Sequence, residues 1–268
     1  MKLFYREYGE GIPLIILHGL YGSSDNWMSI AKTLSSDFRV IVPDLRNHGQ
    51  SPHHKDHSYP SMTKDVLDLF ESCGIDKAHI LGHSMGGKLA MFFAAEYPDM
   101  LDKMIVADMS PRSYKNLSEP SEHANFHLNL MDKLLQTDIS SQENFADVDE
   151  ILSKEITDER LRGFFLKNIK KTDAGLEWKL NLKSLRDNLP EIMEGLYADD
   201  FATKKIRIPV LFLRGEKSDY ISLDDFSFIR FIFPQSEIIS IPDAGHWLHA
   251  EQPKLFIKNV KYFLKPQA

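Results

Sequence analysis

Residues 79–93 read HILGHSMGGKLAMFF, an apolar run followed by Gly-x-Ser-x-Gly and then by a run with helical character. When a serine occupies a sharp turn between a strand and a helix, its backbone is strained and its hydroxyl is exposed, and bulky residues two positions away clash. Gly82 and Gly86 flank Ser84 at those two positions. The stretch therefore predicts that Ser84 is a nucleophile. The amide of Met85, at the positive end of the helix, then lies beside any negative charge that forms on an attacked carbonyl.

Short apolar runs alternate with helical patterns along much of the chain. Several runs are continuously apolar, which is typical of strands in a parallel sheet covered on both faces. Helices are predicted at 59–72 and 222–233, and Gly9-Glu10-Gly11 predicts a hairpin turn between two strand-like runs. The alternation predicts the α/β class, with a mostly parallel central sheet flanked by helices. The expected strands are 14–17, 39–42, 79–81, 103–107, 210–213 and 237–241.

The segment 112–205 interrupts this alternation. No convincing strand is visible in it, whereas helical spacing is frequent, as in the apolar residues at i, i+4 and i+8 of 126–134. A helical insertion between two strands of a parallel sheet lies over the carboxyl edge of the sheet, where ligands bind. We therefore predict a core formed by 1–111 and 206–268, with a helical cap, 112–205, inserted after the strand that ends at Asp108. The alternative is a set of packing helices with no role in access to the site.

The composition and net charge limit the kinds of partner that the chain is expected to bind. A chain of 268 residues, 43% hydrophobic and 26% charged, is ordinary for a soluble globular protein. The net charge of −7 and the isoelectric point near 5.9 argue against nucleic acid or an anionic membrane as the main partner, because both bind basic surfaces. No apolar run approaches the roughly 20 residues of a membrane span, and 1–7 lacks the apolar region of a signal peptide. Cys73 is the only cysteine, which excludes an internal disulfide and leads us to expect a cytoplasmic protein. The sequence leaves the oligomeric state open.

His246 is the predicted general base. A serine nucleophile needs a base to remove its proton and a carboxylate that orients the base and stabilises its charged form. The sequence PDAGHW, 242–247, follows the last predicted strand, so its histidine lies on a loop at the same sheet edge as Ser84. A purely structural role suits most of the eleven histidines, but loop position and chain order favour catalysis for His246.

The loop after the first apolar strand is predicted to complete the oxyanion hole. Residues 18–23 read HGLYGS, and the glycine at the second position lets the backbone pass close to a substrate. We expect the backbone N–H groups of Leu20 and Met85 to donate to the oxyanion. Tyr21 is a candidate substrate-binding residue, with simple lining as the alternative. Trp178 is a second candidate from the cap, with helix packing as the alternative.

Two aspartates satisfy the requirements for the acid. Asp108 ends the strand after the nucleophile helix, within VADMSP, 106–111. Asp219 follows a later strand, within RGEKSDY, 214–220. Either strand end can approach the histidine loop, and the chain order serine, acid, histidine holds for both. From the residues alone, both candidates stay open.

The chain resembles the α/β-hydrolase superfamily over essentially its whole length. The segments at that superfamily's spacing are LHG (17–19), DLRNHGQS (44–51), GHSMGG (82–87) and AGH (244–246). In the second of these, Asp44 and His48 are expected to tie their loop down rather than react. A narrower resemblance, to the YbfF-type esterases and their mitochondrial relatives, is carried by LHGLYGS (17–23), VPDLRNHGQSP (42–52), SYPS (58–61) and VADMSP (106–111). It implies carboxylesterase activity, with thioesterase activity toward acyl-CoA known among relatives.

The resemblance also bears on the acid. The commonest superfamily pattern places the acid three residues after the glycine that ends the later strand, where this chain has Ser218. YbfF-type sequences also have serine there and are similar to this chain in the aspartate of VAD-x-SP, which is Asp108. The resemblance therefore favours Asp108 and keeps Asp219 as the alternative acid.

These residues predict a serine esterase with the catalytic triad Ser84, His246 and Asp108, acting through an acyl-enzyme on small or medium acyl esters. The cap is rich in Phe, Leu and Met, which suits an apolar acyl group. No cofactor or metal is required. An acyl-CoA thioesterase is the main alternative, because it uses the same residues and differs only in the leaving group. A carbon–carbon bond hydrolase or lyase needs basic groups in the cap, where no basic cluster is visible, and a non-catalytic ligand receptor with an intact triad is the remaining alternative.

Overall fold

The computed structural model describes residues 1–115, 121–173 and 175–265. Its centre is a seven-stranded sheet in the order β1-β3-β2-β4-β5-β8-β9, in which every neighbouring pair except β1 and β3 is parallel. The predicted mostly parallel sheet is confirmed, and each of the six expected strands lies within an observed one. The strands are β1 (Tyr5–Tyr8), β2 (Pro13–Leu17), β3 (Arg39–Pro43), β4 (Ala78–His83), β5 (Leu101–Ala107), β8 (Val210–Gly215) and β9 (Ser236–Ile241).

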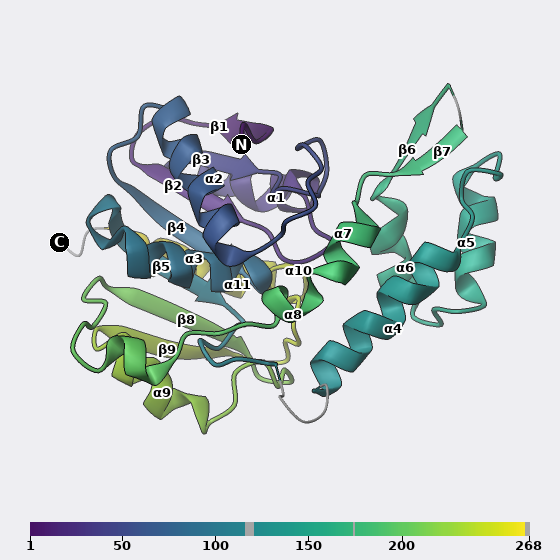
Figure 1. Ribbon diagram of the computed structural model, residues 1–268. Helices are drawn as coiled ribbons and strands as arrows, with labels where there is room; N and C mark the ends of the chain where they lie inside the picture. The colour runs from purple at the N-terminus through teal and green to yellow at the C-terminus, as the bar shows by residue number, and fades with distance from the viewer. Residues whose placement is uncertain (116–120, 174, 266–268) are drawn as a thin grey trace.

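Helices cover both faces of this sheet (Figure 1). Successive residues of β2 point to opposite faces: Ile15 and Leu17 join one buried apolar cluster, and Leu14 and Ile16 join the other. Burial on both sides explains why the strands are continuously apolar. One face packs on α2 (Tyr59–Ser72), α3 (Met85–Glu96) and α9 (Asp225–Ile232), and the other on α1 (Ser24–Leu34), α10 (Leu248–Glu251) and α11 (Pro253–Leu264). A short 3-10 helix, η1 (Pro98–Met100), leads into β5.

The two predicted helices differ in how well their bounds agree with the structure. The helix predicted at 59–72 coincides with α2. The helix predicted at 222–233 is shorter than expected, because the carboxylate of Asp225 accepts hydrogen bonds from the amide and the hydroxyl of Ser222 at 2.7 and 2.9 Å. These bonds close a turn before the helix begins.

The predicted hairpin turn at Gly9-Glu10-Gly11 is wrong. The two strands that it separates, β1 and β2, do not pair; β3 lies between them, antiparallel to β1 and parallel to β2. Gly9 has a φ of +74°, and a Cβ there would lie 2.4 Å from the carbonyl oxygen of Ser35, so the chain crosses close to the end of α1. Pairing on both edges of β3 satisfies more backbone groups than a two-stranded hairpin would.

The residues described between 112 and 205, called the insertion below, are mainly helical, but the expectation of no strand there is wrong. A two-stranded antiparallel sheet pairs β6 (Ile169–Thr172) with β7 (Gly175–Trp178). These strands are short, and Lys170 and Lys171 are exposed, so no buried apolar run marks them in the sequence. The other elements are α4 (Glu122–Gln136), α5 (Phe145–Ser153), α6 (Glu159–Leu166), α7 (Leu182–Asp187), α8 (Leu189–Ile192) and η2 (Ala198–Phe201).

The insertion leaves and rejoins the sheet at one place. The amide of Tyr114 donates to the carbonyl of Met193, and the amide of Leu196 donates to that of Pro111, both at 2.8 Å. Gly195 lies so close to the outgoing chain that a Cβ there would be 2.2 Å from the amide nitrogen of Ser113. This crossing holds the insertion beside the sheet, with α4 and α6 on the side of the nucleophile turn (Figure 1).

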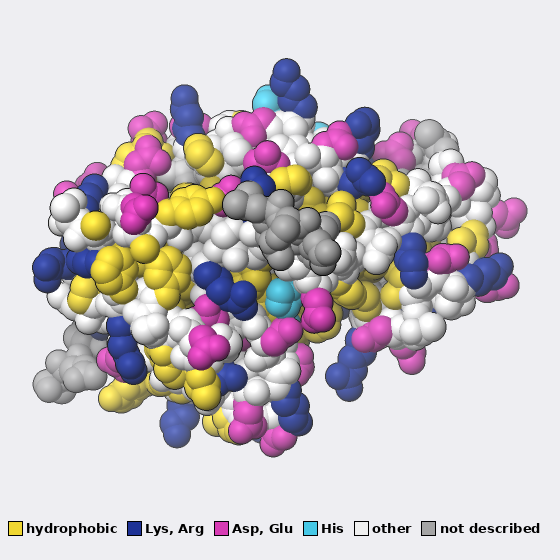
Figure 2. Space-filling view, turned by 60° about the horizontal axis from the view of Figure 1, so that its bottom comes forward, with side chains coloured by type: hydrophobic (Ala, Val, Ile, Leu, Met, Phe, Trp, Pro, Cys, Tyr) yellow, Lys and Arg dark blue, Asp and Glu magenta, His cyan; other side chains and the backbone are white. Residues whose placement is uncertain are grey.

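One face of the molecule is mixed in charge. On the face shown in Figure 2, Lys and Arg side chains alternate with Asp and Glu side chains instead of gathering in one area. Among the helices within the described ranges, none is both long enough and apolar enough to cross a membrane.

Candidate active site

Ser84 lies at the turn between β4 and α3, in a backbone conformation that side chains rarely adopt, with φ 54° and ψ −123°. The turn needs its glycines. A Cβ on Gly82 would lie 2.2 Å from the carbonyl oxygen of Gly86, and a Cβ on Gly86 would lie 2.2 Å from that of Leu17. Packing of this kind over-determines the strained serine and holds its hydroxyl at the end of the sheet.

His246 lies beside this serine. Its Nε2 is 3.0 Å from the Oγ of Ser84. The residue follows β9 on the loop that leads into α10, and its own carbonyl accepts a hydrogen bond of 2.8 Å from the Nε2 of His83, within β4. The ring of Tyr220 stacks on its imidazole, with ring centroids 3.9 Å apart and planes 20° apart. Backbone and ring together fix the orientation of this imidazole.

Asp108 completes a hydrogen-bonded line. Its Oδ2 lies 2.8 Å from the Nδ1 of His246, and the carboxylate is fully buried at the end of β5. Because a carboxylate accepts, Nδ1 carries the hydrogen, and Nε2 is left free to accept the proton of Ser84. The Oδ1 of Asp108 accepts from the amide of Gly215 at 2.9 Å, and its Oδ2 also accepts from the hydroxyl of Ser218. The carboxylate is therefore held by β8 as well as by its own strand.

Asp219 lies elsewhere. Its side chain is 78% exposed, and its closest ion-pair partner is the Nε2 of His123 at 3.7 Å. The structure thus brings Asp108, and not Asp219, to His246. Sequence reasoning named Ser218 only as the residue that stands where an acid is common, and missed that its hydroxyl donates to Asp108.

The loop after β2 passes directly over the nucleophile. A Cβ on Gly19 would lie 3.0 Å from the Cβ of Ser84, and Tyr21 has a φ of +63°. Within the ranges that the structure describes, no protein group accepts a hydrogen bond from the amide of Leu20 or of Met85. Both predicted donors therefore have hydrogens available to a ligand beside Ser84.

Two buried histidines hold this loop. The Nδ1 of His18 donates to the carbonyl of Gly19 at 2.8 Å, and its Nε2 accepts from the amide of Leu45 at 2.9 Å. The Nε2 of His48 accepts from the amide of Tyr21 at 3.1 Å. Burial lowers the pKa of His18, and it lowers the pKa of His48 well below its usual value, so both rings stay neutral and able to accept. The expected role of His48 in tying down a loop thus extends to the loop over Ser84.

Asp44 plays the tying role expected of it. Its Oδ1 accepts from the amide of Ser24 at 2.6 Å and its Oδ2 from the amide of Gln50 at 2.8 Å. These bonds join the start of α1 to the loop after β3.

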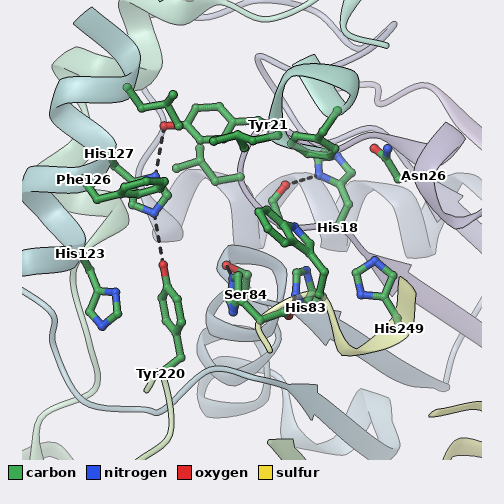
Figure 3. Close-up of a pocket in the computed structure, with 18 of the residues that line it drawn as sticks. His18, Tyr21, Asn26, His83, Ser84, His123, Phe126, His127, Tyr220 and His249 are labelled. Atoms are coloured by element: carbon green, nitrogen blue, oxygen red, sulfur yellow. Dashed lines mark hydrogen bonds between the residues drawn. The ribbon is translucent and has the colours of Figure 1, made fainter. Parts of the chain in front are cut away.

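A cavity of about 360 Å³ opens above Ser84 (Figure 3). In Figure 3 the serine lies between His123, Phe126 and His127 of α4 on one side and Asn26, His83 and His249 of the core on the other. Tyr21 lines the cavity. Trp178 is not among the described residues that line it; its side chain on β7 borders a separate hollow. The insertion contributes Phe126, Leu130, Leu161 and Phe164 as apolar lining.

The chain is similar to known proteins that are named esterases or lipases. A family model described as "alpha/beta hydrolase fold" matches residues 12–253. The sn-1-specific diacylglycerol lipase ABHD11 of Danio rerio is 37% identical over 96% of this chain and 80% of its own. Esterase YbfF of Escherichia coli is 32% identical over 94% of this chain and 92% of its own. A solved structure titled "Marine microorganism esterase" is 44% identical, with a TM-score of 0.93 over 98% of this chain and 99% of its own.

Proposed function

This chain belongs to the alpha/beta hydrolase family and is a carboxylesterase-type hydrolase, and within that class we propose that it cleaves uncharged carboxylic esters through an acyl-enzyme on Ser84. The observation that carries the proposal is the hydrogen-bonded line from Ser84 through His246 to Asp108 beneath an apolar cavity. Asp108 is the acid of this mechanism, and Asp219 has no part in it.

Acylation begins when the Oγ of Ser84 attacks the ester carbonyl carbon and its proton passes to the Nε2 of His246. The oxygen of the tetrahedral intermediate takes the negative charge and accepts hydrogen bonds from the amides of Leu20 and Met85. Asp108 stabilises the imidazolium through Nδ1. The carbon–oxygen bond to the alcohol then breaks, and the alcohol oxygen takes the proton from His246.

Deacylation repeats these steps with water. His246 removes a proton from water, the hydroxide oxygen attacks the acyl carbon, and a second tetrahedral intermediate forms against the same two amides. Its collapse breaks the bond to the Oγ of Ser84, which recovers the proton from His246. The products are a carboxylic acid and an alcohol, and every proton transfer uses His246.

The cavity lining supports an uncharged, apolar acyl group of small or medium size. Of the described residues that line it, seven come from the insertion and none is Lys or Arg. A second carboxylate on the acyl chain would therefore be buried without a cationic partner, which is costly. This is why a carbon–carbon bond hydrolase acting on an anionic substrate is the weaker proposal. The similarity to ABHD11, which is named a diacylglycerol lipase, agrees with an uncharged ester carrying apolar chains.

We further propose that residues 112–205 act as a cap on a core of 1–111 and 206–268. The support is that α4 and α6 supply one wall of the cavity over Ser84. Thioesters remain within the proposal as alternative substrates, because acylation of Ser84 is the same for a thiol leaving group. The cytoplasmic location also stays a prediction, from the single cysteine.

A graded series of esters tests the proposal. Initial rates are measured with nitrophenyl esters and CoA thioesters of acetyl to decanoyl groups, with Ser84→Ala as the control variant. We expect turnover that Ser84→Ala abolishes, highest for short or medium acyl groups. A half-ester of a dicarboxylic acid, matched in length, should be a poor substrate. Turnover that persists in Ser84→Ala, or tight ester binding with no turnover, would contradict the mechanism.

A further inference from the structure

Tyr21 is held in a strained conformation directly after Leu20, whose amide is one of the two oxyanion donors in the proposed mechanism. Its φ of +63° is rarely adopted by residues other than glycine, and its side chain is buried. A residue keeps such a conformation only where its surroundings over-determine it. The groups that hold Tyr21 therefore also set the position of the Leu20 amide.

Three groups hold Tyr21, and two of them come from the insertion. The amide of Tyr21 donates to His48, as described above. Its carbonyl accepts a hydrogen bond of 2.9 Å from the side-chain amide of Asn168, and its hydroxyl is hydrogen-bonded at 3.2 Å to the Nδ1 of His127. Backbone and side chain of one residue are thus fixed by two separate elements, α4 and the loop between α6 and β6.

Asn168 is itself firmly placed. It is 2% exposed, its amide donates to the carbonyl of Phe165 at 2.8 Å, and its carbonyl accepts from the amide of Lys179 at 2.7 Å. Its side chain also donates to the carbonyl of Phe164 at 3.2 Å. Because Asn168 is buried and its backbone is fixed, its side-chain amide holds the carbonyl of Tyr21 in one position.

His127 links the same loop to the catalytic histidine. Its Nε2 is hydrogen-bonded at 3.3 Å to the hydroxyl of Tyr220, the residue whose ring stacks on His246. Burial lowers the pKa of His127 to about 3, so its ring is neutral, with one nitrogen that donates and one that accepts. Figure 3 shows this imidazole between the two tyrosines, with a dashed line to each hydroxyl.

We infer that Asn168 and His127 are positioning residues for the oxyanion hole, acting through Tyr21. The inference rests on the proposed function, because it gives the amide of Leu20 a role in that reaction. An oxyanion donor is effective only within a few tenths of an ångström of its ideal distance, and removing one donor costs about 10²–10³ in kcat. The insertion therefore does more than wall the cavity, since it completes the geometry of the catalytic loop.

The test compares two asparagines of the insertion that both hydrogen-bond to the core. Asn168→Ala removes the donor to Tyr21. Asn188→Ala is the matched control: it removes a donor to the carbonyl of Lys55 at 2.8 Å and an acceptor from the amide of His57 at 3.0 Å, with neither partner on the loop over Ser84. Tyr21→Phe removes the bond between the Tyr21 hydroxyl and His127 while keeping a ring in place. His127→Phe removes that bond and also the bond from His127 to the hydroxyl of Tyr220. Steady-state kinetics, thermal unfolding and the Ki of a trifluoromethyl ketone, which forms an oxyanion on Ser84, are measured for each.

We expect Asn168→Ala to lower kcat by about 10–100-fold with KM within about twofold. The Ki of the ketone should rise in proportion to the loss of kcat/KM. His127→Phe and Tyr21→Phe should each lower kcat by about 3–10-fold by the same route, whereas Asn188→Ala should keep kcat and the Ki near those of the parent. This pattern in a folded variant is not produced by a general loss of stability.

Two results would overturn the inference: kcat and Ki of Asn168→Ala within about twofold of the parent, or equal losses in Asn168→Ala and Asn188→Ala. If Asn168→Ala does not fold, His127→Phe and Tyr21→Phe decide by the same criteria. Failure of the proposed function looks different, because the parent protein would then show no turnover that depends on Ser84.

Discussion

The hydroxyl of Ser218 donates a hydrogen bond to the carboxylate of Asp108, across 110 positions of the sequence. Ser218 stands on the loop after β8, where the superfamily commonly carries its acid, and Asp108 directly follows β5. In this chain the carboxylate comes instead from the residue after the neighbouring strand, and Ser218 donates a hydrogen bond to it. The two strands are adjacent and parallel, so their ends reach the same point beside His246.

Replacing each candidate aspartate in turn should show which one is the acid of the triad. Asp108→Asn should lower kcat by about 10³–10⁴-fold, because the amide no longer selects the productive tautomer of His246 or stabilises its charged form. Asp219→Asn should keep kcat within about twofold, since its side chain is 78% exposed. Hydrolysis of a nitrophenyl ester measures both. A large loss in Asp219→Asn alone would reassign the acid.

Removal of the Ser218 hydroxyl should have a smaller effect. Ser218→Ala takes one donor from a buried carboxylate, and a hydrogen bond to a charged group contributes about 1.5–3 kcal/mol. The amide of Gly215 and the ring of His246 remain. We expect kcat to fall by about 3–20-fold and the thermal midpoint to fall by a few degrees. Activity equal to that of the parent would show that this bond has no part in orienting Asp108.

The buried histidines should make the fold sensitive to acid. Burial lowers the pKa of His57 and of His249 to about 3, whereas in the unfolded chain each titrates near its ordinary value of about 6.5. Below pH 6.5 the unfolded state therefore binds more protons, and stability falls as the pH falls, by at most about 1.4 kcal/mol per pH unit for each group. His249→Phe, which keeps a ring stacked on Trp27, should lose about 1–2 kcal/mol less than the parent between pH 7 and 5. Urea unfolding at both values gives the comparison, and parallel losses in the two proteins would contradict it.

Two glycines offer a matched test of close packing at the nucleophile turn. Gly86→Ala places a Cβ 2.2 Å from the carbonyl oxygen of Leu17 and 2.6 Å from that of His18, so it should cost about 1–3 kcal/mol of stability and displace the loop over Ser84. Gly163→Ala, within α6, meets nothing within 4 Å and should stabilise by about 0.5–1 kcal/mol. Thermal unfolding and kcat distinguish the two. An active, fully stable Gly86→Ala would be the contrary result.

The chain-length preference should depend on the wall that the insertion provides. Phe164→Ala enlarges the cavity and should raise kcat/KM for octanoyl relative to butanoyl esters by about 3–10-fold, since each buried methylene contributes about 0.8 kcal/mol. Trp178→Ala is the control, because Trp178 borders a different hollow and its loss should leave the acyl profile unchanged. A shift of the profile in Trp178→Ala would restore this residue as a substrate contact.

The sequence by itself determined the features that depend on neighbouring residues. The turn at Ser84 follows from steric rules that act over two residues, and the strands follow from apolar runs that demand burial on both faces. The hairpin expected at Gly9-Glu10-Gly11 shows the limit of such rules, because they do not include β3, which pairs with both flanking strands.

Only the tertiary structure decided which distant groups meet. Asp108 and Asp219 both follow strands and precede the histidine in sequence, and packing alone brings the first to 2.8 Å from His246. Likewise, Asn168 reaches the carbonyl of Tyr21 across 147 positions. Local patterns fix the backbone of each segment, whereas strand order and the crossing of the insertion fix which side chains share one sheet edge, and the chemistry at Ser84 depends on both.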